Sequence, residues 1–538
     1  MSSSRRYLFF IPLLLLACAL LGGMFAPDAQ PVAAASQQKP AATDEDLRSS
    51  LDSFTKVYDV VEQNYADKVS SDKAIYKGAI PGMLRTLDPH SNFLDPKEFA
   101  GLREEQHGMY YGIGMLIGAQ PRTGKPMVVH PFGGSPAYKA GLRPGDLLIE
   151  VNSRRVDTLN TTEVADMLKG PKGTSVRVVV TREGSKQPIT FNLIRTEIPR
   201  NSVDTAFWVK PGIAYLRIQS FTETTSKEVE DNLKALGERN IKSLVLDLRE
   251  NPGGLLQEGV GVAGRWLDRG QVVVSHKGRA YSEKPYLARG SQYGESYPIV
   301  VLVDRYSASA AEIVAGALQD HDRAWILGDT TFGKGLVQTV YPLSDNTGLL
   351  LTTQHYYTPS GRLIQRDYSN ISFLDYYYDR HTAVKDPTDV KQTDLGRVVY
   401  GGGGITPDEK YQTPKLDGFE LTVARKNAFF DFSSYYFANH STKLSTGWIP
   451  DEGVLNDFHD FLMKQGVQFT EADWTRDHSW LRDQLRAEMY ITAFSYEDSQ
   501  RIAVEQDPEI AKAIDAMPKA ANLLAESKAR FEKQTASR

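Results

Sequence analysis

The segment from Ile299 to Leu318 constrains the fold of this chain more than any other. Its apolar run Ile299–Val303 predicts a buried strand, a polar Ser/Ala turn follows, and Glu312–Leu318 has the apolar spacing of a helix. A strand, a tight turn and a helix start in this order are typical of an α/β domain. Ser309 falls in the turn, where the first N–H groups of a helix are unpaired and stabilise negative charge. The position suits a nucleophile, while the capping-box pattern of Ser309 and Glu312 leaves a purely structural cap open.

The loop after the next predicted strand differs from a phosphate-binding P-loop in one decisive way. Gly328–Gly335 reads GDTTFGKG, one residue short of that motif. A P-loop needs Ser or Thr after its lysine, to hold magnesium, and a helix behind it. Here Gly335 follows Lys334, and Leu336–Val340 alternates like a strand. Nucleotide binding at this loop is therefore excluded.

Lys334 and Gln338 lie four residues apart, so a strand that carries both projects them from the same face. A lysine held beside an amide on a buried strand serves as a general base once its amine is neutral. Lowering a lysine pKa from about 10.4 to about 7.5 takes roughly 4 kcal/mol of differential desolvation, a shift that buried lysines do reach. The alternatives are a surface lysine whose ammonium reaches water and a solvent-facing glutamine.

In these residues the chain resembles the C-terminal processing proteases, also called tail-specific proteases, which are PDZ-containing serine peptidases with a Ser/Lys dyad. The matching runs are SASAAEIVAGALQD, RAWILGDTTFGKGLVQ and LLLTTQHYYTPSGRLIQ. The resemblance implies that Ser309 is the nucleophile, Lys334 the general base and Gln338 the residue that orients the lysine. It also implies a crotonase-like fold. Ala311 stands where many members have serine, a departure that we expect to be harmless.

A strand-to-helix corner with the sequence DLRENPGG supplies candidates for an oxyanion hole. Its glycines, Gly253 and Gly254, leave bare N–H groups, and one of these donors together with the N–H of Ala310 would form the hole. Each such donor is worth about 3 to 4 kcal/mol in the transition state. The resemblance points to Gly254. Gly253 remains an alternative, and the two glycines also fit a tight turn alone.

A β-rich module at residues 108–198 resembles a PDZ domain of the protease-associated type. A glycine-bearing loop leaves N–H groups that hold a terminal carboxylate, and the adjoining strand edge pairs with the end of a peptide. Gly112, Ile113 and Gly114 are the carboxylate candidates, although the glycines also fit a simple turn. Lys169 lies where family members often carry a basic residue that couples this domain to the active site.

The predicted fold class is α/β: a crotonase-like serine peptidase core with an inserted-type β-rich PDZ domain and helical regions at both ends. The regions are a leader at 1–35, a helical segment at 36–107, the PDZ domain at 108–198, the peptidase domain at 199–408 and a helical extension at 409–538. Ile510–Phe531 reads as one helix of that extension, whose function the sequence does not indicate.

Two helices are predicted between Asp44 and Gln106, and Asp88-Pro-His-Ser-Asn ends the second. An apolar helix pair outside the main domains suits packing on a second subunit, which the resemblance favours. We therefore expect a homo-oligomer, and a regulatory adaptor protein is left open as a further partner. His90 is expected to stabilise a turn, since its neighbourhood in the sequence holds neither a nucleophile nor a metal-ligand set.

The N-terminus has the pattern of an export signal. Arg5 and Arg6 precede the mostly apolar run Tyr7–Phe25, and a small, polar stretch follows. Cleavage after Ala35 or retention as a membrane anchor ranks above lipidation at Cys18, because more apolar residues follow the cysteine. The expected location is the periplasm or the outer face of the cytoplasmic membrane.

Composition excludes several classes of function. The formal charge is −5 over 538 residues, with no basic cluster outside the leader, which argues against nucleic-acid binding. Cys18 is the one cysteine, so a mature chain without the leader has neither a disulfide nor a cysteine nucleophile. HExxH and paired Cys/His spacings are absent, and we expect no metal and no cofactor.

The sequence therefore predicts an exported serine endopeptidase that captures protein C-termini on its PDZ domain and cuts through an acyl-enzyme. The alternative is a noncatalytic PDZ adaptor on an inactive peptidase fold. Two other interpretations are weaker. Ser70 and Lys73 match the Ser-x-x-Lys spacing of penicillin-binding acyltransferases only on a polar turn, and His355 has no acidic partner motif for a Ser-His mechanism.

Overall fold

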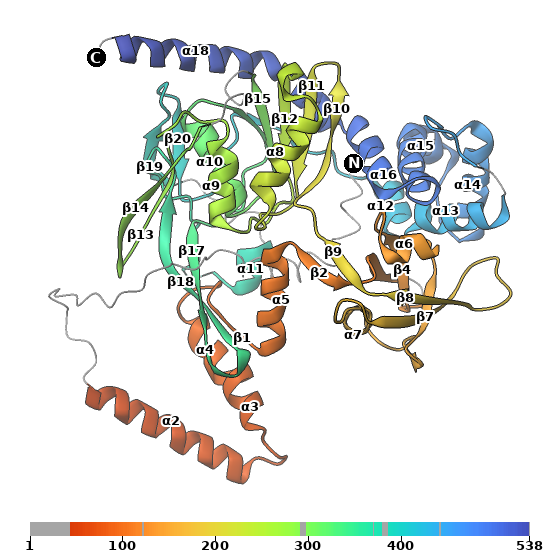
Figure 1. The fold of residues 1–538 in the computed structure, drawn as a ribbon, viewed down its shortest axis with the longest axis horizontal. Helices are drawn as coiled ribbons and strands as arrows, with labels where there is room; N and C mark the ends of the chain where they lie inside the picture. The colour runs from red at the N-terminus through yellow and green to blue at the C-terminus, as the bar shows by residue number, and fades with distance from the viewer. Residues whose placement is uncertain are drawn as a thin grey trace.

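The computed structural model describes residues 44–120, 123–290, 297–369, 371–378, 386–440 and 443–536. The proposed leader at 1–35, with Cys18, lies outside these ranges. Within them, no helix combines the length and the apolar character that crossing a bilayer requires. The chain forms a two-sheet peptidase core, a PDZ module and helical regions before and after them, which agrees with the predicted fold class (Figure 1).

A six-stranded sheet forms the centre of the peptidase core. All neighbouring strands in it run parallel except the first pair, which is antiparallel. In spatial order its strands are β10 (Val203–Lys210), β11 (Ile213–Ile218), β12 (Ser243–Asp247), β15 (Ile299–Val303), β16 (Trp325–Gly328) and β21 (Glu409–Lys410). All five residues of β15 are buried, because both faces of this sheet are covered. This explains why the central strands read as continuous apolar runs.

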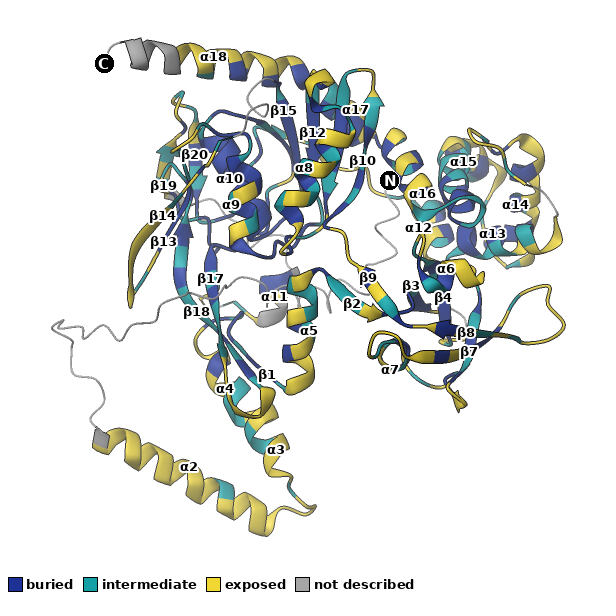
Figure 2. Ribbon diagram, viewed as in Figure 1, coloured by how far each residue is buried: buried dark blue, intermediate teal, exposed yellow. Residues whose placement is uncertain are grey.

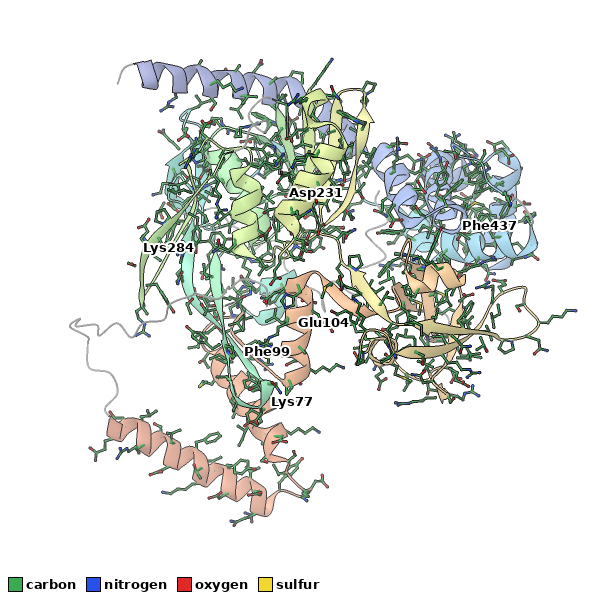
Figure 3. All side chains as sticks on the ribbon, in the orientation of Figure 1. Lys77, Phe99, Glu104, Asp231, Lys284 and Phe437 are labelled. Carbon is green, nitrogen blue, oxygen red and sulfur yellow. The ribbon has the colours of Figure 1, made fainter. Side chains whose placement is uncertain are left out.

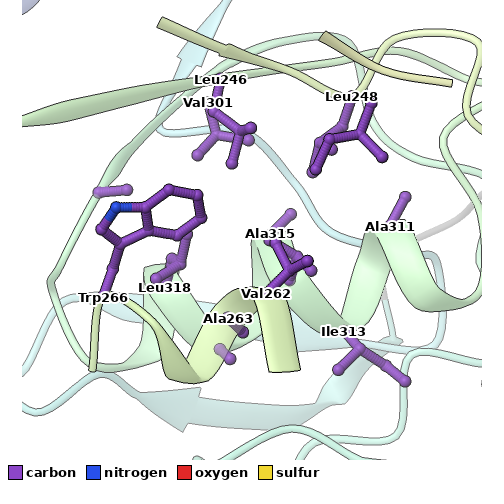
Figure 4. Close-up of a cluster of buried hydrophobic side chains, with 14 of the residues drawn as sticks. Leu246, Leu248, Val262, Ala263, Trp266, Val301, Ala311, Ile313, Ala315 and Leu318 are labelled. Carbon is purple, nitrogen blue, oxygen red and sulfur yellow. The ribbon is translucent and has the colours of Figure 1, made fainter. Parts of the chain in front are cut away.

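One face of the sheet is covered by α8 (Thr225–Ala235), α9 (Leu256–Gly264) and α10 (Ala310–Asp320). Leu246 and Val301 from the strands face Trp266 and residues of α9 and α10 in a continuous apolar core (Figure 4). The short 3₁₀ turn η3 (Glu238–Asn240) follows α8. This packing fixes the start of α10, where Ser309 lies.

The opposite face is covered by the end of the chain. Here α17 (Pro508–Asp515) and α18 (Met517–Ala536) pack on the alternate strand residues, among them Val245, Val300 and Leu302. The prediction of one helix over Ile510–Phe531 is wrong. The structure has two helices there, because Pro518 lacks an N–H and its ring cannot continue α17.

A second sheet of the core is antiparallel and carries Gln338. Its strands are β1 (Asn92–Leu94), β13 (Val272–Gly278), β14 (Tyr281–Leu287), β17 (Leu336–Pro342) and β18 (Gly348–Tyr357), with a 3₁₀ turn η4 (Ser344–Asn346) between the last two. β1 belongs to the N-terminal region and pairs with β18. The sequence did not predict this strand, which brings the N-terminal region into the peptidase core.

The segment between β18 and β21 holds α11 (Phe373–Tyr378), β19 (Asp386–Gln392) and β20 (Val398–Gly401). Tyr376 and Tyr377 of α11 are buried against Ala308 and Phe332. This segment therefore contributes an aromatic cluster next to the Ser309 turn.

The PDZ module has its own sheet and core. The sheet is formed by β3 (Met115–Ala119), β4 (Pro126–Pro131), β5 (Leu147–Val151), β6 (Arg154–Arg155), β7 (Ser175–Thr181) and β8 (Ile189–Ile194), with helices α6 (Pro136–Ala140) and α7 (Thr161–Leu168). A two-stranded ribbon of β2 (Met109–Gly112) and β9 (Thr196–Pro199) lies outside this sheet, at the junction with the peptidase core.

The N-terminal region is helical as predicted. It contains α2 (Asp44–Asn64), α3 (Ser71–Ala74), the π-turn η2 (Ile75–Ala79), α4 (Ile80–Arg85) and α5 (Pro96–His107). α2 stands apart from the rest of the chain and is exposed along nearly its whole length (Figure 2). The uncovered apolar side chains of α2 are Leu47, Leu51, Phe54, Val57, Val60 and Val61.

The C-terminal extension begins with a helical module that has its own apolar core. Its helices are α12 (Gly418–Arg425), α13 (Ala428–Asn439), α14 (Glu452–Lys464), α15 (Glu471–Ala493) and α16 (Tyr496–Glu505). This module also contacts the PDZ domain, since the rings of His130 and Tyr496 stack with their centroids 4.2 Å apart. The extension thus contacts both the PDZ domain and the peptidase sheet.

Candidate active site

Ser309 lies in the turn between β15 and α10, as its sequence context predicted. Its backbone has φ 53° and ψ −114°, a combination that non-glycine residues rarely adopt. Such strain persists only where surrounding contacts hold it, and it is concentrated at functional sites. The residue is 6% exposed, and its N–H donates to Glu312 Oε2 at 2.9 Å.

Glu312 joins the serine turn to the lysine loop. Besides the N–H of Ser309, its fully buried carboxylate accepts the N–H groups of Gly333 at 2.7 Å and Lys334 at 2.8 Å and the hydroxyl of Thr331 at 2.5 Å. Burial raises the pKa of Glu312, and these hydrogen bonds oppose that shift. The sequence indicated only the capping role, because the partners of the second loop lie about twenty residues away.

The predicted pairing of Lys334 with Gln338 is present. The amine of Lys334 donates to Gln338 Oε1 at 3.0 Å, and the two side chains are 2% and 0% exposed. The strand argument holds only in part, since β17 begins at Leu336 and its pairing with β18 shifts register between Val337 and Gln338. Lys334 therefore precedes the strand and reaches Gln338 through the length of its side chain.

The main chain of His90 orients the glutamine. Gln338 Nε2 donates to the carbonyl oxygen of His90 at 2.7 Å, so Oε1 is the atom that faces Lys334. Sequence reasoning missed this contact, because the two residues are 248 positions apart. The expected turn is there as well: Asp88 Oδ1 accepts the N–H groups of His90 and Ser91, each at 2.7 Å.

The His90 imidazole is enclosed by tyrosines. Its Nε2 lies 2.9 Å from the hydroxyl of Tyr376, and its Nδ1 lies 3.2 Å from the hydroxyl of Tyr377. Burial lowers the pKa of His90 well below its ordinary value, and the positive charges of Lys334 and Arg366 add to this effect. The ring is therefore neutral and supports the loop as a hydrogen-bonding group.

The DLRENPGG corner lies directly under Ser309. A Cβ built on Gly253 would be 2.6 Å from the Cβ of Ser309 and 2.9 Å from the nitrogen of Ala310, so only glycine fits at this position, where φ is 97°. The N–H of Gly253 already donates to Asn251 Oδ1 at 2.8 Å. Gly253 is thus occupied as a donor.

Gly254 is positioned by a parallel bridge to Phe221. The N–H of Phe221 donates to the carbonyl oxygen of Gly253, and the N–H of Leu255 donates to the carbonyl oxygen of Phe221. Because N–H groups alternate in direction along an extended chain, the N–H of Gly254 points away from Phe221. Within the described ranges, neither this N–H nor that of Ala310 has an acceptor. These are the two donors that the sequence analysis favoured.

In the PDZ module, the candidate carboxylate loop accepts hydrogen bonds with its carbonyl groups, while two of its N–H groups donate none to any described residue. Ile113 accepts from the N–H of Ala137, and Gly114 accepts from the hydroxyl of Ser135 at 2.7 Å. In the described part of the chain, the N–H groups of Ile113 and Gly114 meet no acceptor. Gly112 differs from them, since it ends strand β2, opposite Thr196.

Lys169 contacts the N-terminal region. Its amine donates to Glu104 Oε2 of α5 at 2.5 Å and lies 5.2 Å from the ring centroid of Tyr110 (Figure 3 labels Glu104). The PDZ domain is therefore tied to α5, and α5 follows the strand that pairs with β18.

The other candidate from the sequence, His355, lies within a strand of the second sheet. It is in β18 opposite Leu336, and burial lowers the pKa of its imidazole. Among the described residues, no group of three or more His, Cys, Asp or Glu side chains is arranged to hold a metal ion.

Comparison with known proteins gives family matches in three regions. Residues 212–370 match peptidase family S41, residues 133–182 match a PDZ domain, and residues 18–98 match the activating protease CtpB N-terminal domain. The carboxy-terminal-processing protease of Bartonella bacilliformis is 37% identical over 317 residues, which cover 58% of this chain and 72% of that protein. Carboxy-terminal processing protease CtpB of Bacillus subtilis is 30% identical over 397 residues, which cover 72% of this chain and 79% of the relative.

Among solved structures, the photosystem II D1 C-terminal processing protease is 30% identical, with a TM-score of 0.36, and the match covers 67% of this chain and 87% of that one. The sequence relatives and the S41 and PDZ matches agree with a peptidase core that is combined with a PDZ module. The chain belongs to the carboxy-terminal processing proteases, which are serine-type peptidases.

Proposed function

We propose that the protein is an exported endopeptidase that cuts proteins at or near their C-termini by a Ser/Lys acyl-enzyme mechanism. The observation that carries the mechanism is the buried chain from Lys334 through Gln338 to the His90 carbonyl, joined to the strained Ser309 turn by Glu312. An adaptor on an inactive fold would not require a buried lysine held in this way.

In the proposed reaction, the Ser309 oxygen attacks the scissile carbonyl carbon while its proton passes to Lys334 Nζ. The N–H groups of Gly254 and Ala310 bind the oxyanion. The C–N bond then breaks, and the leaving amine takes the proton from Lys334. Water then attacks the acyl-enzyme and gives a proton to Lys334. The ester C–O bond breaks, the Ser309 oxygen takes that proton back from Lys334, and the new C-terminal carboxyl group leaves and ionises.

Substrate capture is proposed at the PDZ loop. The N–H groups of Ile113 and Gly114 would bind the terminal carboxylate, with Gly112 allowing the chain to approach. Lys169 would link an occupied PDZ domain to the peptidase core through Glu104 and α5.

The tail preference is tested with two denatured protein substrates that differ only in a free or an amidated C-terminus. A hydrogen bond to a charged group is worth about 1.5 to 3 kcal/mol, so amidation is expected to raise KM roughly ten- to hundredfold. A third substrate, in which one internal glutamate is replaced by glutamine, controls for loss of charge. Equal KM values for all three substrates would contradict capture of the tail carboxylate.

We also propose that α2 packs on a second copy of the chain. The support is its uncovered apolar face, because six such side chains on one helix are costly to leave in water. Changing Leu51 and Phe54 to aspartate is expected to yield monomers in light-scattering measurements, whereas Gln63→Asp on the opposite face leaves the oligomer intact. A parent protein that is already monomeric at micromolar concentration would contradict the proposal.

Export is proposed from the Arg5, Arg6 and Tyr7–Phe25 pattern. Fractionation of expressing cells is expected to place the protein in the periplasm or on the outer face of the membrane. N-terminal sequencing then distinguishes cleavage after Ala35 from retention of the leader. Recovery of the intact chain in the cytosol would contradict export.

A further inference from the structure

One of the contacts between the C-terminal extension and the peptidase core is made by an arginine of the DLRENPGG corner, Arg249. Arg249 Nη1 donates to Asp507 Oδ2 and to Glu509 Oε2, each at 2.8 Å. Asp507 caps α17, accepting the N–H of Glu509 at 2.8 Å, and both acids are buried. The residues in this contact are about 260 positions apart in the sequence, and the two acids belong to a segment whose role the sequence did not indicate.

The other side of the same guanidinium is held by the central sheet. Arg249 Nη2 donates to Asp247 Oδ2 at 2.6 Å, and its Nε lies 3.0 Å from Asp247 Oδ1. Asp247 ends strand β12 and also accepts the hydroxyl of Tyr215 at 2.8 Å. A planar guanidinium bound on two sides has one orientation, so Arg249 connects the sheet rigidly to α17.

The corner that follows Arg249 is fixed residue by residue as far as the glycines. Glu250 has φ 59°, and its N–H donates to Asp304 Oδ1 at 2.9 Å. Asn251 accepts the N–H of Ala308 at 2.9 Å and donates to the carbonyl of Ile218 at 2.7 Å. Its Oδ1 then receives the N–H of Gly253, which lies under Ser309. We expect a shift at Arg249 to pass along this connected corner to the donor at Gly254.

We propose that Asp507 and Glu509 are positioning residues for the peptidase reaction. By holding Arg249, they fix the corner 249–254 and thus the Gly254 N–H that binds the oxyanion. The inference rests on the proposed function of Gly254 and Ser309. The start of α17 thereby becomes part of the catalytic unit, although it lies outside the peptidase family match at residues 212–370.

Charge makes this contact sensitive to pH. Burial raises the pKa of Glu509 to about 7; Arg249 lowers it, and Asp507 and Asp247 raise it further. The Tyr411 hydroxyl, from the segment after β21, also faces these acids. Above pH 7 the Glu509 carboxylate is ionised and pairs with Arg249; below pH 7 it takes up a proton and becomes neutral.

The test compares the full chain with the double variant Asp507→Asn/Glu509→Gln. Three properties are measured for each protein: the rate at which a fluorophosphonate reacts with Ser309, the kcat and KM for a peptide substrate, and the melting temperature. Asparagine caps helices as well as aspartate does, so α17 is retained. The matched control is Glu238→Gln, which weakens the 2.6 Å contact with Arg265. The side chains of Arg265 and Glu238 are 13% and 5% exposed, which is close to the 15% and 6% of Arg249 and Glu509.

The double variant is expected to lose on the order of tenfold to hundredfold in labelling rate and kcat, with KM unchanged, because small misplacements of reacting groups have effects of this size. The Glu238→Gln control is expected to keep the parent labelling rate and kcat, even if its melting temperature falls as much as that of the double variant. Parent rates in the double variant, or equal losses in the control, would overturn the inference. A parent that the reagent does not label at Ser309 would overturn the proposed function and this inference with it.

A single Glu509→Gln variant tests the charge, because glutamine imitates the protonated acid. The ratio of parent to variant labelling rates is expected to approach one below about pH 6 and to grow above pH 7, in step with ionisation of the Glu509 carboxyl. Titration of Lys334 is common to both proteins and cancels in the ratio. A ratio that does not change with pH would show that the Glu509 charge does not position Arg249.

Discussion

Replacing Ser309 by alanine, or Lys334 by methionine, is expected to lower kcat/KM for a denatured protein by at least about 10⁴-fold, because nucleophile and base act as one unit. The alanine variant has no oxygen to form the acyl-enzyme. The methionine variant keeps the volume of the buried side chain and removes the amine that donates to Gln338 Oε1. The variant that combines Ser309→Ala with Lys334→Met is expected to be no less active than either single variant.

The measurement is cleavage by the purified chain from Ser36 onward, followed by electrophoresis and mass spectrometry of the products. The matched control is Lys277→Met, which removes an exposed lysine from β13 of the second sheet and is expected to leave activity unchanged. Folding of each variant is checked by circular dichroism. If Lys334→Met kept more than about a tenth of the parent activity, Lys334 would not be the base; if the parent itself failed to cleave, the adaptor alternative would gain support.

Replacing Glu312 by glutamine is expected to destabilise the protein by roughly 3 kcal/mol and to slow catalysis about 10²-fold. The buried carboxylate accepts from four donors, namely the N–H groups of Ser309, Gly333 and Lys334 and the hydroxyl of Thr331. An amide offers one acceptor oxygen, and its NH₂ group would face N–H donors where the carboxylate presents its second oxygen. The turn that holds Ser309 at φ 53° would then relax away from the lysine loop.

Urea unfolding measures the loss of stability, and the fluorophosphonate reaction at Ser309 measures the loss of alignment. Glu258→Gln is the control, since this carboxylate lies on α9 and accepts the N–H of Ser226 of α8 at 2.7 Å. We expect it to lose less stability and to keep the parent labelling rate. A Glu312→Gln protein as stable and as reactive as the parent would exclude the bridging role of this carboxylate.

Elements with continuous apolar patterns were predicted well. The bounds of β15 agree with the sequence, and those of α10 agree within a few residues. In a parallel sheet covered on both faces, each strand must be apolar throughout, and that requirement is visible without a structure. β1 was missed because three residues beside a Pro-rich turn carry no periodicity, and the break between α17 and α18 was missed because the apolar spacing continues across Pro518.

The sequence by itself determined the serine turn, the lysine loop and the glycine corner, because each depends on neighbouring residues. The tertiary structure alone decided which distant groups complete them: the His90 carbonyl for Gln338, the Glu312 carboxylate for the lysine loop, and the acids of α17 for Arg249. Buried polar groups must find partners, but the identity of each partner depends on how the layers pack and follows from no local pattern.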